Sequence, residues 1–219
     1  AAAPDDVLAR LVLADKLQEL GDGPARDEQM AAARRIDPDG SSVPSRRHEM
    51  QRVRTAMVDK FDDAKGIYET APLLEYLETE RHAEILFEGW SYLGNLYSRL
   101  GRNAESRHAF RTAWATVPPD QRVSFGNSLA GGFWTMRDEL KGDERKFALK
   151  VATSVCEASG AAGADDVTRA GYLDTLACCY FLNGKRAQAQ RTLEECIRLD
   201  PTQKSYAARR EAFRGLEGP

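Results

Sequence analysis

The sequence predicts an all-α fold made of short helices that fold back on each other in pairs. The clearest pair lies between Tyr172 and Pro201, where apolar residues recur at the i, i+3, i+4, i+7 spacing that places them on one face of a helix. Gly184 interrupts this pattern and predicts the turn between the two helices. The second helix is expected to stop just before Pro201, because the residue before a proline tends to leave the helical region. Segments 89–118 and 121–158 repeat the same order of residues.

Composition and charge narrow the class of protein. The 219 residues suffice for one large or two small domains, and 42% hydrophobic with 30% charged residues is typical of a globular chain. The formal net charge of -3 provides no basic field for a phosphate backbone, so we expect no nucleic-acid partner. No apolar run approaches the ~20 residues that cross a bilayer, and we expect no membrane partner.

The cysteines are expected to be packing residues. Three of them lie on apolar faces of predicted helices, where a free cysteine behaves as a small hydrophobe. The full set is Cys156, Cys178, Cys179 and Cys196. No pair has the CxxC spacing of a zinc site, so we expect no metal and no other cofactor, and reduced thiols in a cytoplasmic protein. A disulfide or redox role is the alternative.

The N-terminal part of the chain is expected to be less regular. Residues 1–38 predict a degenerate helical hairpin that turns at Gly21. The segment from Asp39 to Ser45, DGSSVPS, is the clearest loop in this half and is interpreted as a flexible joint.

The region 39–86 is expected to hold this joint, a half-matching hairpin at 45–71 and a helical insert that starts at Pro72. The insert either forms an extra helix or lengthens the next one. The second helix of the half-matching hairpin carries inward-facing residues at the expected spacing, namely Phe61, Ala64, Tyr68 and Ala71.

The most regular segment is 89–118, GWSYLGNLYSRLGRNAESRHAFRTAWATVP. It contains a W-x2-L-G-x2-Y run, and eight of its residues fall at the template positions of a 34-residue repeat. These residues are Trp90, Leu93, Gly94, Tyr97, Gly101, Phe110, Ala113 and Pro118. Residues 89–118 and the pair ending at Pro201 resemble the tetratricopeptide repeat (TPR) family. Ser106 departs from the family pattern, where alanine is commoner.

The resemblance implies a right-handed α-solenoid of four to five TPR-like helical hairpins with a C-terminal capping helix. The three better repeats are placed at 87–118, 121–158 and 170–201, within a region 87–219 that ends in the cap at 202–219. The N-terminal hairpin bears a weaker resemblance to short helical companion segments found beside repeats in some bacterial proteins.

The resemblance also implies a function, since TPR proteins bind a peptide or a protein domain in a concave groove lined by the first helix of each hairpin. The implied partner-facing residues are Tyr92, Asn95, Arg99, Asn127, Trp134, Asp174, Cys178 and Phe181. For Asn95 and Arg99 the alternative is a solvated polar position, and for Trp134 it is the core. TPR proteins that hold acidic C-terminal tails use lysines that are missing here, so that specificity is not carried over.

An enzymatic function is not expected. His48, His82 and His108 lie in three different charged helices, where we expect them on the surface, and none shares a motif with a nucleophile or a carboxylate pair. Phosphate-binding and hydrolase motifs are missing from the sequence. The pair Gly131-Gly132 lies inside a predicted helix, where we interpret it as a site of close helix packing.

We therefore predict a non-enzymatic protein-interaction scaffold. The alternative is a C-terminal accessory or oligomerisation domain of a larger multidomain enzyme, which contacts an upstream part or another copy of itself. The chain begins at Ala1 without a methionine, which we interpret as the start of an excised piece, with removal of a leader as the other explanation. A third possibility is a small-molecule sensor site between the N-terminal hairpin and the insert.

Overall fold

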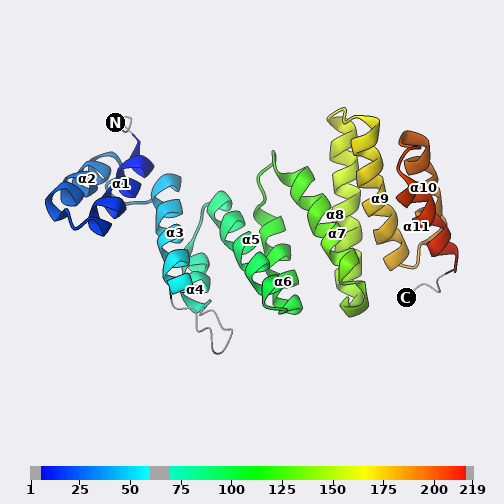
Figure 1. Ribbon diagram of the computed structural model, residues 1–219, viewed down its shortest axis with the longest axis horizontal. Helices are drawn as coiled ribbons and strands as arrows, with labels where there is room; N and C mark the ends of the chain where they lie inside the picture. The colour runs from blue at the N-terminus through cyan, green and yellow to red at the C-terminus, as the bar shows by residue number, and fades with distance from the viewer. Residues whose placement is uncertain (1–5, 60–69, 216–219) are drawn as a thin grey trace. The chain divides into compact units, whose positions relative to one another are not determined.

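The computed structural model describes residues 6–59 and 70–215, and these residues form helices and connecting turns (Figure 1). The described part holds no strand, so the predicted all-α class is confirmed. The chain divides into two compact units, residues 1–116 (unit 1) and 117–219 (unit 2).

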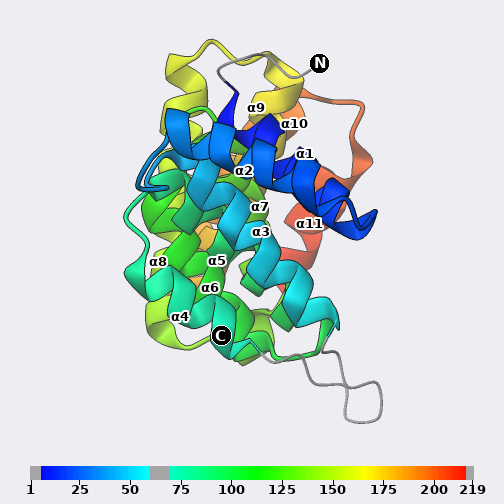
Figure 2. The same ribbon diagram turned by 90° about the vertical axis from the view of Figure 1, so that its left-hand side faces the viewer.

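The described residues of unit 1 form six α-helices. They are α1 (Val7–Glu19), α2 (Gly23–Ile36), α3 (Val43–Asp59), α4 (Ala71–Thr79), α5 (Ala83–Arg99) and α6 (Asn103–Thr116). Helices α1 and α2 form one hairpin and α5 and α6 another, while α3 packs against α1, α4 and α5 (Figure 1 and Figure 2).

The α5–α6 hairpin explains its W-x2-L-G-x2-Y run. Leu93 and Tyr97 are buried in the core that α3, α4, α5 and α6 share. Gly94 lies directly against the ring of Phe110 from α6, since a Cβ added at Gly94 would come within 2.6 Å of that ring. The glycine therefore allows the two helices to approach closely.

Three of the hairpin turns use a glycine in the left-handed region of backbone conformation. Gly21, Gly101 and Gly184 have φ angles of 76°, 69° and 70°. Residues with a Cβ rarely adopt this conformation, which is why glycine ends helices so often. The turns predicted at Gly21 and Gly184 are thus confirmed.

The α2–α3 connection is shorter than the predicted loop, because α3 begins at Val43 and includes Ser45. Asp37, at the end of α2, accepts hydrogen bonds from the hydroxyls of Ser42 (2.6 Å) and Ser45. The Ser42 hydroxyl is the main cause of a lowered pKa at Asp37. This segment is therefore tied to the start of α3 by its own side chains.

Part of the prediction for the insert is confirmed as well. Helix α4 is the extra helix, and α5 begins at Ala83, well before Trp90. Of the residues predicted for the helix before it, Phe61, Ala64 and Tyr68 lie outside the described residues, and Ala71 begins α4.

The described residues of unit 2 form five α-helices and one 3-10 turn. They are α7 (Arg122–Thr135), η1 (Arg137–Glu139), α8 (Gly142–Ala161), α9 (Asp166–Leu182), α10 (Arg186–Leu199) and α11 (Lys204–Gly215). Helices α7 and α8 pair, as do α9 and α10, and α11 packs on α10 (Figure 1).

The α7–α8 turn differs from the other turns. Helix α8 begins at Gly142 and already includes Asp143, and the 3-10 turn η1 lies in the connection before it. The carboxylate of Glu144 accepts a hydrogen bond from the Lys141 backbone N–H (2.9 Å), which fixes the start of α8.

Candidate functional site

The predicted binding residues of unit 1 follow one face of α5. Tyr92, Asn95 and Arg99 recur at the i, i+3, i+7 spacing, so their side chains share this face. Tyr92 is half-buried, whereas Asn95 and Arg99 are exposed. The Asn95 side-chain amide donates to the Ser91 backbone oxygen (2.9 Å), which uses one of its two N–H groups. Among the described residues Arg99 has no ion-pair partner.

A residue that the sequence did not indicate joins this face. The guanidinium of Arg54, from α3, lies over the ring of Tyr92 with its central carbon 3.9 Å from the ring centroid. We name the four residues Arg54, Tyr92, Asn95 and Arg99 the α3–α5 surface. The signal that could have revealed Arg54 is its spacing from Arg47, seven residues earlier on the same face of α3.

In unit 2 the predicted residues of α7 remain partly accessible. Asn127 is half-buried, and its side-chain oxygen has no hydrogen-bond donor among the described residues. A Cβ added at Gly131 or Gly132 would meet open space, so the prediction that this pair allows close helix packing is wrong. The unpaired Asn127 oxygen is itself buried, and one turn further along α7 the backbone at Gly131 has no side-chain cover.

The predicted residues of α9 are covered by α11 of the same chain. Phe213 of α11 stacks on Phe181, with ring centroids 4.1 Å apart, and its edge meets Trp134 at 5.5 Å. Arg209 of α11 forms an ion pair with Asp174. Phe181 is 4% exposed and Cys178 is 2% exposed.

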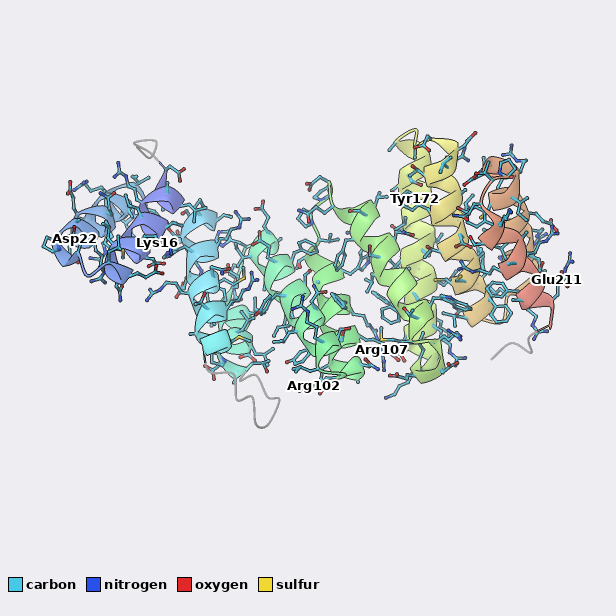
Figure 3. The ribbon with its side chains drawn as sticks, in the orientation of Figure 1. Lys16, Asp22, Arg102, Arg107, Tyr172 and Glu211 are labelled. Atoms are coloured by element: carbon cyan, nitrogen blue, oxygen red, sulfur yellow. The ribbon has the colours of Figure 1, made fainter. Side chains whose placement is uncertain are left out.

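The covering helix turns its polar side outward. Glu211 of α11, labelled in Figure 3, forms an ion pair with Arg214, and its side chain is largely exposed. Burial raises the pKa of Asp174, although Arg209 opposes this shift, so the ion pair is held in a partly dehydrated setting. The last hairpin therefore presents α11, rather than the α9 residues, to its surroundings.

The histidines do not all lie on the surface as predicted. His48 is only 10% exposed at its side chain, and its Nε2 lies 2.8 Å from an Asp15 carboxylate oxygen, so the pair connects α3 with α1. His82 lies 2.8 Å from Glu80 through Nδ1. His108 is exposed, with its ring edge toward Trp90. The prediction is therefore wrong for His48, because the α1–α3 contact buries a residue that the local pattern left outside.

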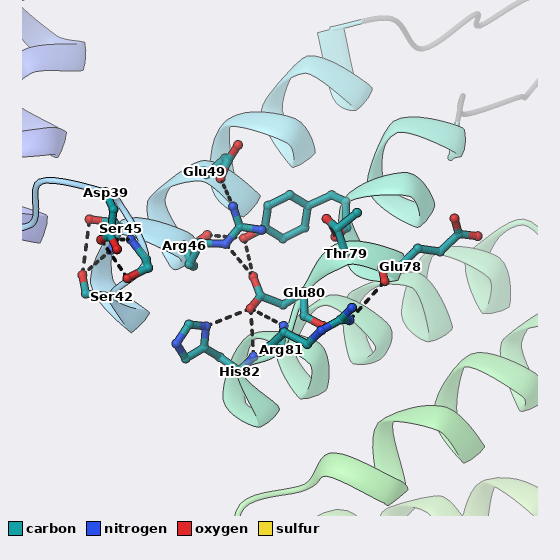
Figure 4. A network of polar contacts seen from close by, with 12 residues as sticks. Asp39, Ser42, Ser45, Arg46, Glu49, Glu78, Thr79, Glu80, Arg81 and His82 are labelled. Atoms are coloured by element: carbon teal, nitrogen blue, oxygen red, sulfur yellow. Dashed lines mark hydrogen bonds and ion pairs between the residues drawn. The ribbon is translucent and has the colours of Figure 1, made fainter.

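Glu80 is the most strongly perturbed acid of the described residues (Figure 4). It is buried, which raises its pKa, but backbone N–H groups of His82 (2.8 Å) and Arg81 (2.7 Å) and the Arg46 guanidinium (2.9 Å) favour the carboxylate more strongly. The net result is a pKa of about 2. Tyr76 also donates to Glu80, at 2.9 Å. A carboxylate occupied in this way anchors the α4–α5 connection rather than exchanging protons with a substrate.

The cysteine thiols are weakly reactive because burial raises their pKa values. Burial raises the pKa of Cys178 and Cys196 to about 12 and that of Cys156 to about 11, and it raises the pKa of Cys179 as well. A thiol with a raised pKa is a poor nucleophile near neutral pH. All four cysteines are free.

Residues 6–59 and 70–215 contain neither a metal centre nor a membrane span. No group of three or more His, Cys, Asp or Glu side chains there is arranged to hold a metal ion. No helix in that part of the chain combines the length and the apolar character needed to cross a membrane.

Comparison with known proteins identifies the last hairpin. Residues 170–203, which span most of α9 and all of α10, match the family model described as a tetratricopeptide repeat. The match confirms the tetratricopeptide-repeat resemblance for this hairpin. No curated protein matches the sequence significantly.

Solved structures similar to this chain include the nearly identical TPR-like repeats of a Podosopora anserina protein assigned as a kinesin light chain. That structure is 16% identical, with 93% of this chain and 100% of that chain covered and a TM-score of 0.49. A point-mutant form of the same repeats is 16% identical, with 94% and 98% covered and a TM-score of 0.47.

Proposed function

We propose that the chain is a non-enzymatic scaffold that binds a peptide or a domain of another protein along the first helices of its hairpins. Tetratricopeptide repeats generally mediate protein–protein interaction, and repeat arrays do so through extended surfaces. The observation that carries the proposal is the face of α5, where Asn95 and Arg99 are exposed and Tyr92 holds the Arg54 guanidinium.

In unit 2 the proposal assigns partner contact to α7. Asn127 is half-buried with a buried, unpaired side-chain oxygen, and Trp134 lies on the same face, partly buried against Phe181 and Phe213. Asp174, Cys178 and Phe181 act indirectly, since they hold α11 in place. The buried, weakly acidic thiols and the occupied Glu80 support a role without catalysis.

The test is a comparison of interaction partners between two double variants. Asn95→Ala with Arg99→Ala removes an amide and a guanidinium from the face of α5. Gln188→Ala with Arg191→Ala removes the same chemistry from the second helix α10 and serves as the matched control. We expect the proteins captured by the wild-type chain to be lost from the first variant and retained by the second. An unchanged set of captured proteins in both variants contradicts the proposal.

One observation favours the second candidate, an accessory or oligomerisation domain. Helix α1 buries Leu11 and Ala14 on its inner side but leaves Val12 and Leu13 exposed, as is Leu20 directly after the helix, at 80%. A helix that is apolar on both sides normally has a neighbour on both sides. Sedimentation of the chain and of a Leu13→Ser, Leu20→Ser variant tests this role, since self-association through α1 predicts a complex that the variant loses.

A further inference from the structure

Two arginines of α3 face α5, and the structure gives them different surroundings. Arg47 is neutralised by α5, since its Nη2 lies 2.6 Å from Glu88 and 3.4 Å from Glu84, and its Nε donates to Glu88 at 2.9 Å. The hydrogen bond that Arg47 donates to Glu88 is the main reason that the pKa of Arg47 is raised. At this end of the α3–α5 contact, the positive charge of Arg47 is therefore neutralised by glutamates of α5.

Arg54 lies two turns further along α3, where α5 supplies no acid. The residue of α5 one turn after Glu88 is Tyr92, and Arg54 stacks on its ring at 3.9 Å. The Nε of Arg54 is buried and has no acceptor among the described residues, nor does Arg54 form an ion pair with any of them. Arg54 thus occupies on α3 the position that Arg47 occupies two turns earlier, but without a carboxylate from α5 or from any other described residue.

This arrangement fixes the guanidinium before any ligand arrives. A guanidinium carries five N–H donors in a rigid plane, and a buried donor left unpaired costs free energy. Stacking on Tyr92 holds the plane in place, and because Nε is buried, the terminal groups Nη1 and Nη2 are the donors left to bind a ligand. These two groups match the two oxygens of a carboxylate.

The charge around Arg54 favours the same kind of ligand. Arg99 and Asn95 follow Tyr92 on α5, and Arg99 is a second cation without a described partner. The acids nearest along α5, Glu84 and Glu88, are already engaged by Arg47. The α3–α5 surface consequently carries two positive charges that no described residue neutralises.

We propose that the α3–α5 surface binds an acidic peptide segment of a partner protein, with an Asp or Glu side chain on the terminal Nη groups of Arg54. The proposal rests on the proposed function, because it takes this face to be a protein-binding face. It differs from recognition of an acidic C-terminal tail by lysines, since a side-chain carboxylate and a stacked arginine of α3 make the contact.

The experiment measures binding of the full chain to labelled 12-residue peptides by fluorescence anisotropy. The probes share one alanine- and serine-based sequence and carry three glutamates, three glutamines, three lysines or three phosphoserines at the same positions. We expect the glutamate peptide to bind at least about tenfold more tightly than the glutamine peptide, as a charged hydrogen-bonded pair implies. We also expect this preference to weaken in high salt.

Variants assign the contact to Arg54. Arg54→Gln should weaken binding of the glutamate peptide about tenfold, and Arg54→Lys should restore only part of it, because lysine lacks the planar fork. Arg52→Gln is the matched control, since Arg52 is an exposed arginine of the same helix that lines the hollow toward α1 instead. In the wild-type chain the Arg54 side-chain Nε–H signal, followed by NMR, should shift on addition of the glutamate peptide.

Each result decides between the two proposals. Three outcomes would overturn the acidic-peptide assignment and leave the scaffold function standing. The glutamate and glutamine peptides could bind equally tightly, or the lysine or phosphoserine peptide could bind more tightly than the glutamate peptide. The third outcome is that Arg52→Gln abolishes binding of the glutamate peptide and Arg54→Gln does not. If no peptide binds, the acidic-peptide assignment fails, and the double-variant capture experiment on Asn95 and Arg99 separately decides the scaffold function.

Discussion

Ser106 donates a hydrogen bond from its hydroxyl to the backbone oxygen of Gly94, 2.8 Å away, inside the α5–α6 hairpin. Ser106 is the residue that departs from the repeat pattern, and its side chain is buried. The bond joins the two helices at the point of their closest approach, where Gly94 meets Phe110. The departure therefore adds a polar contact to a site that the repeat normally packs with a methyl group.

Ser106→Ala should lower the free energy of unfolding by about 1 kcal/mol, because a buried hydrogen bond is lost without a change in packing. Urea denaturation measures this difference. Thr112→Ala on the exposed side of α6 is the control. A Ser106→Ala variant more stable than the wild-type chain would show that the Ser106 hydroxyl destabilises the fold.

Gly94→Ala should destabilise the α5–α6 hairpin by about 2 kcal/mol or more, because the new Cβ would sit 2.6 Å from the Phe110 ring. Gly131→Ala is the matched control, since it places the same methyl group in open space in the middle of α7. The control should gain about 0.5–1 kcal/mol from improved helix propensity. The melting temperature should fall in Gly94→Ala and rise in Gly131→Ala, relative to the wild-type chain.

Glu80→Gln should lower the free energy of unfolding at neutral pH, and the difference from the wild-type chain should shrink in acid. The pKa of Glu80 is about 2 in the folded protein against an ordinary 4.5, so its stabilising effect is present above 4.5 and fades as the pH falls toward 2. The difference at pH 7 is on the order of 3 kcal/mol. Urea unfolding of both proteins from pH 7 to 3.5 checks it, and a difference that grows in acid would reverse the assigned sign.

Phe213→Ala should loosen α11 from α9 and cost about 3 kcal/mol, because a stacked, buried ring is removed from between Phe181 and Trp134. Hydrogen exchange should show the loss of protection in α9 and α11. Glu211→Ala on the exposed side of α11 should change stability by less than about 0.5 kcal/mol. Equal effects of the two variants would mean that the ring cluster contributes nothing beyond helix formation.

The sequence was sufficient for the features that depend on local pattern. The hairpins, the glycine turns and the buried faces of α5 and α9 follow from periodicity and from residues with special backbone conformations. The extra helix α4 was one of two options that the pattern left open, and only its packing on α3 and α5 decides it.

Contacts between helices far apart in the chain could not be predicted in this way. The stacking of Arg54 on Tyr92 depends on how α3 lies against α5, and the burial of His48 depends on how α3 lies against α1. The same holds for Phe181, which the pattern placed on a binding face and the structure covers with Phe213. Gly131 shows the opposite error, since a small residue inside a helix suggested packing where there is none.

Position 92 carries a tyrosine where an acidic residue would pair with Arg54, and this choice affects both the stability of the fold and the binding of a ligand. A glutamate there would give Arg54 the same internal neutralisation that Glu88 gives Arg47. Under the acidic-peptide proposal, such a chain would be harder to unfold and, at the same time, unable to bind the acidic segment, because the guanidinium would already be paired. A mutation that looks like an improvement in every stability screen would then act as a loss-of-function allele.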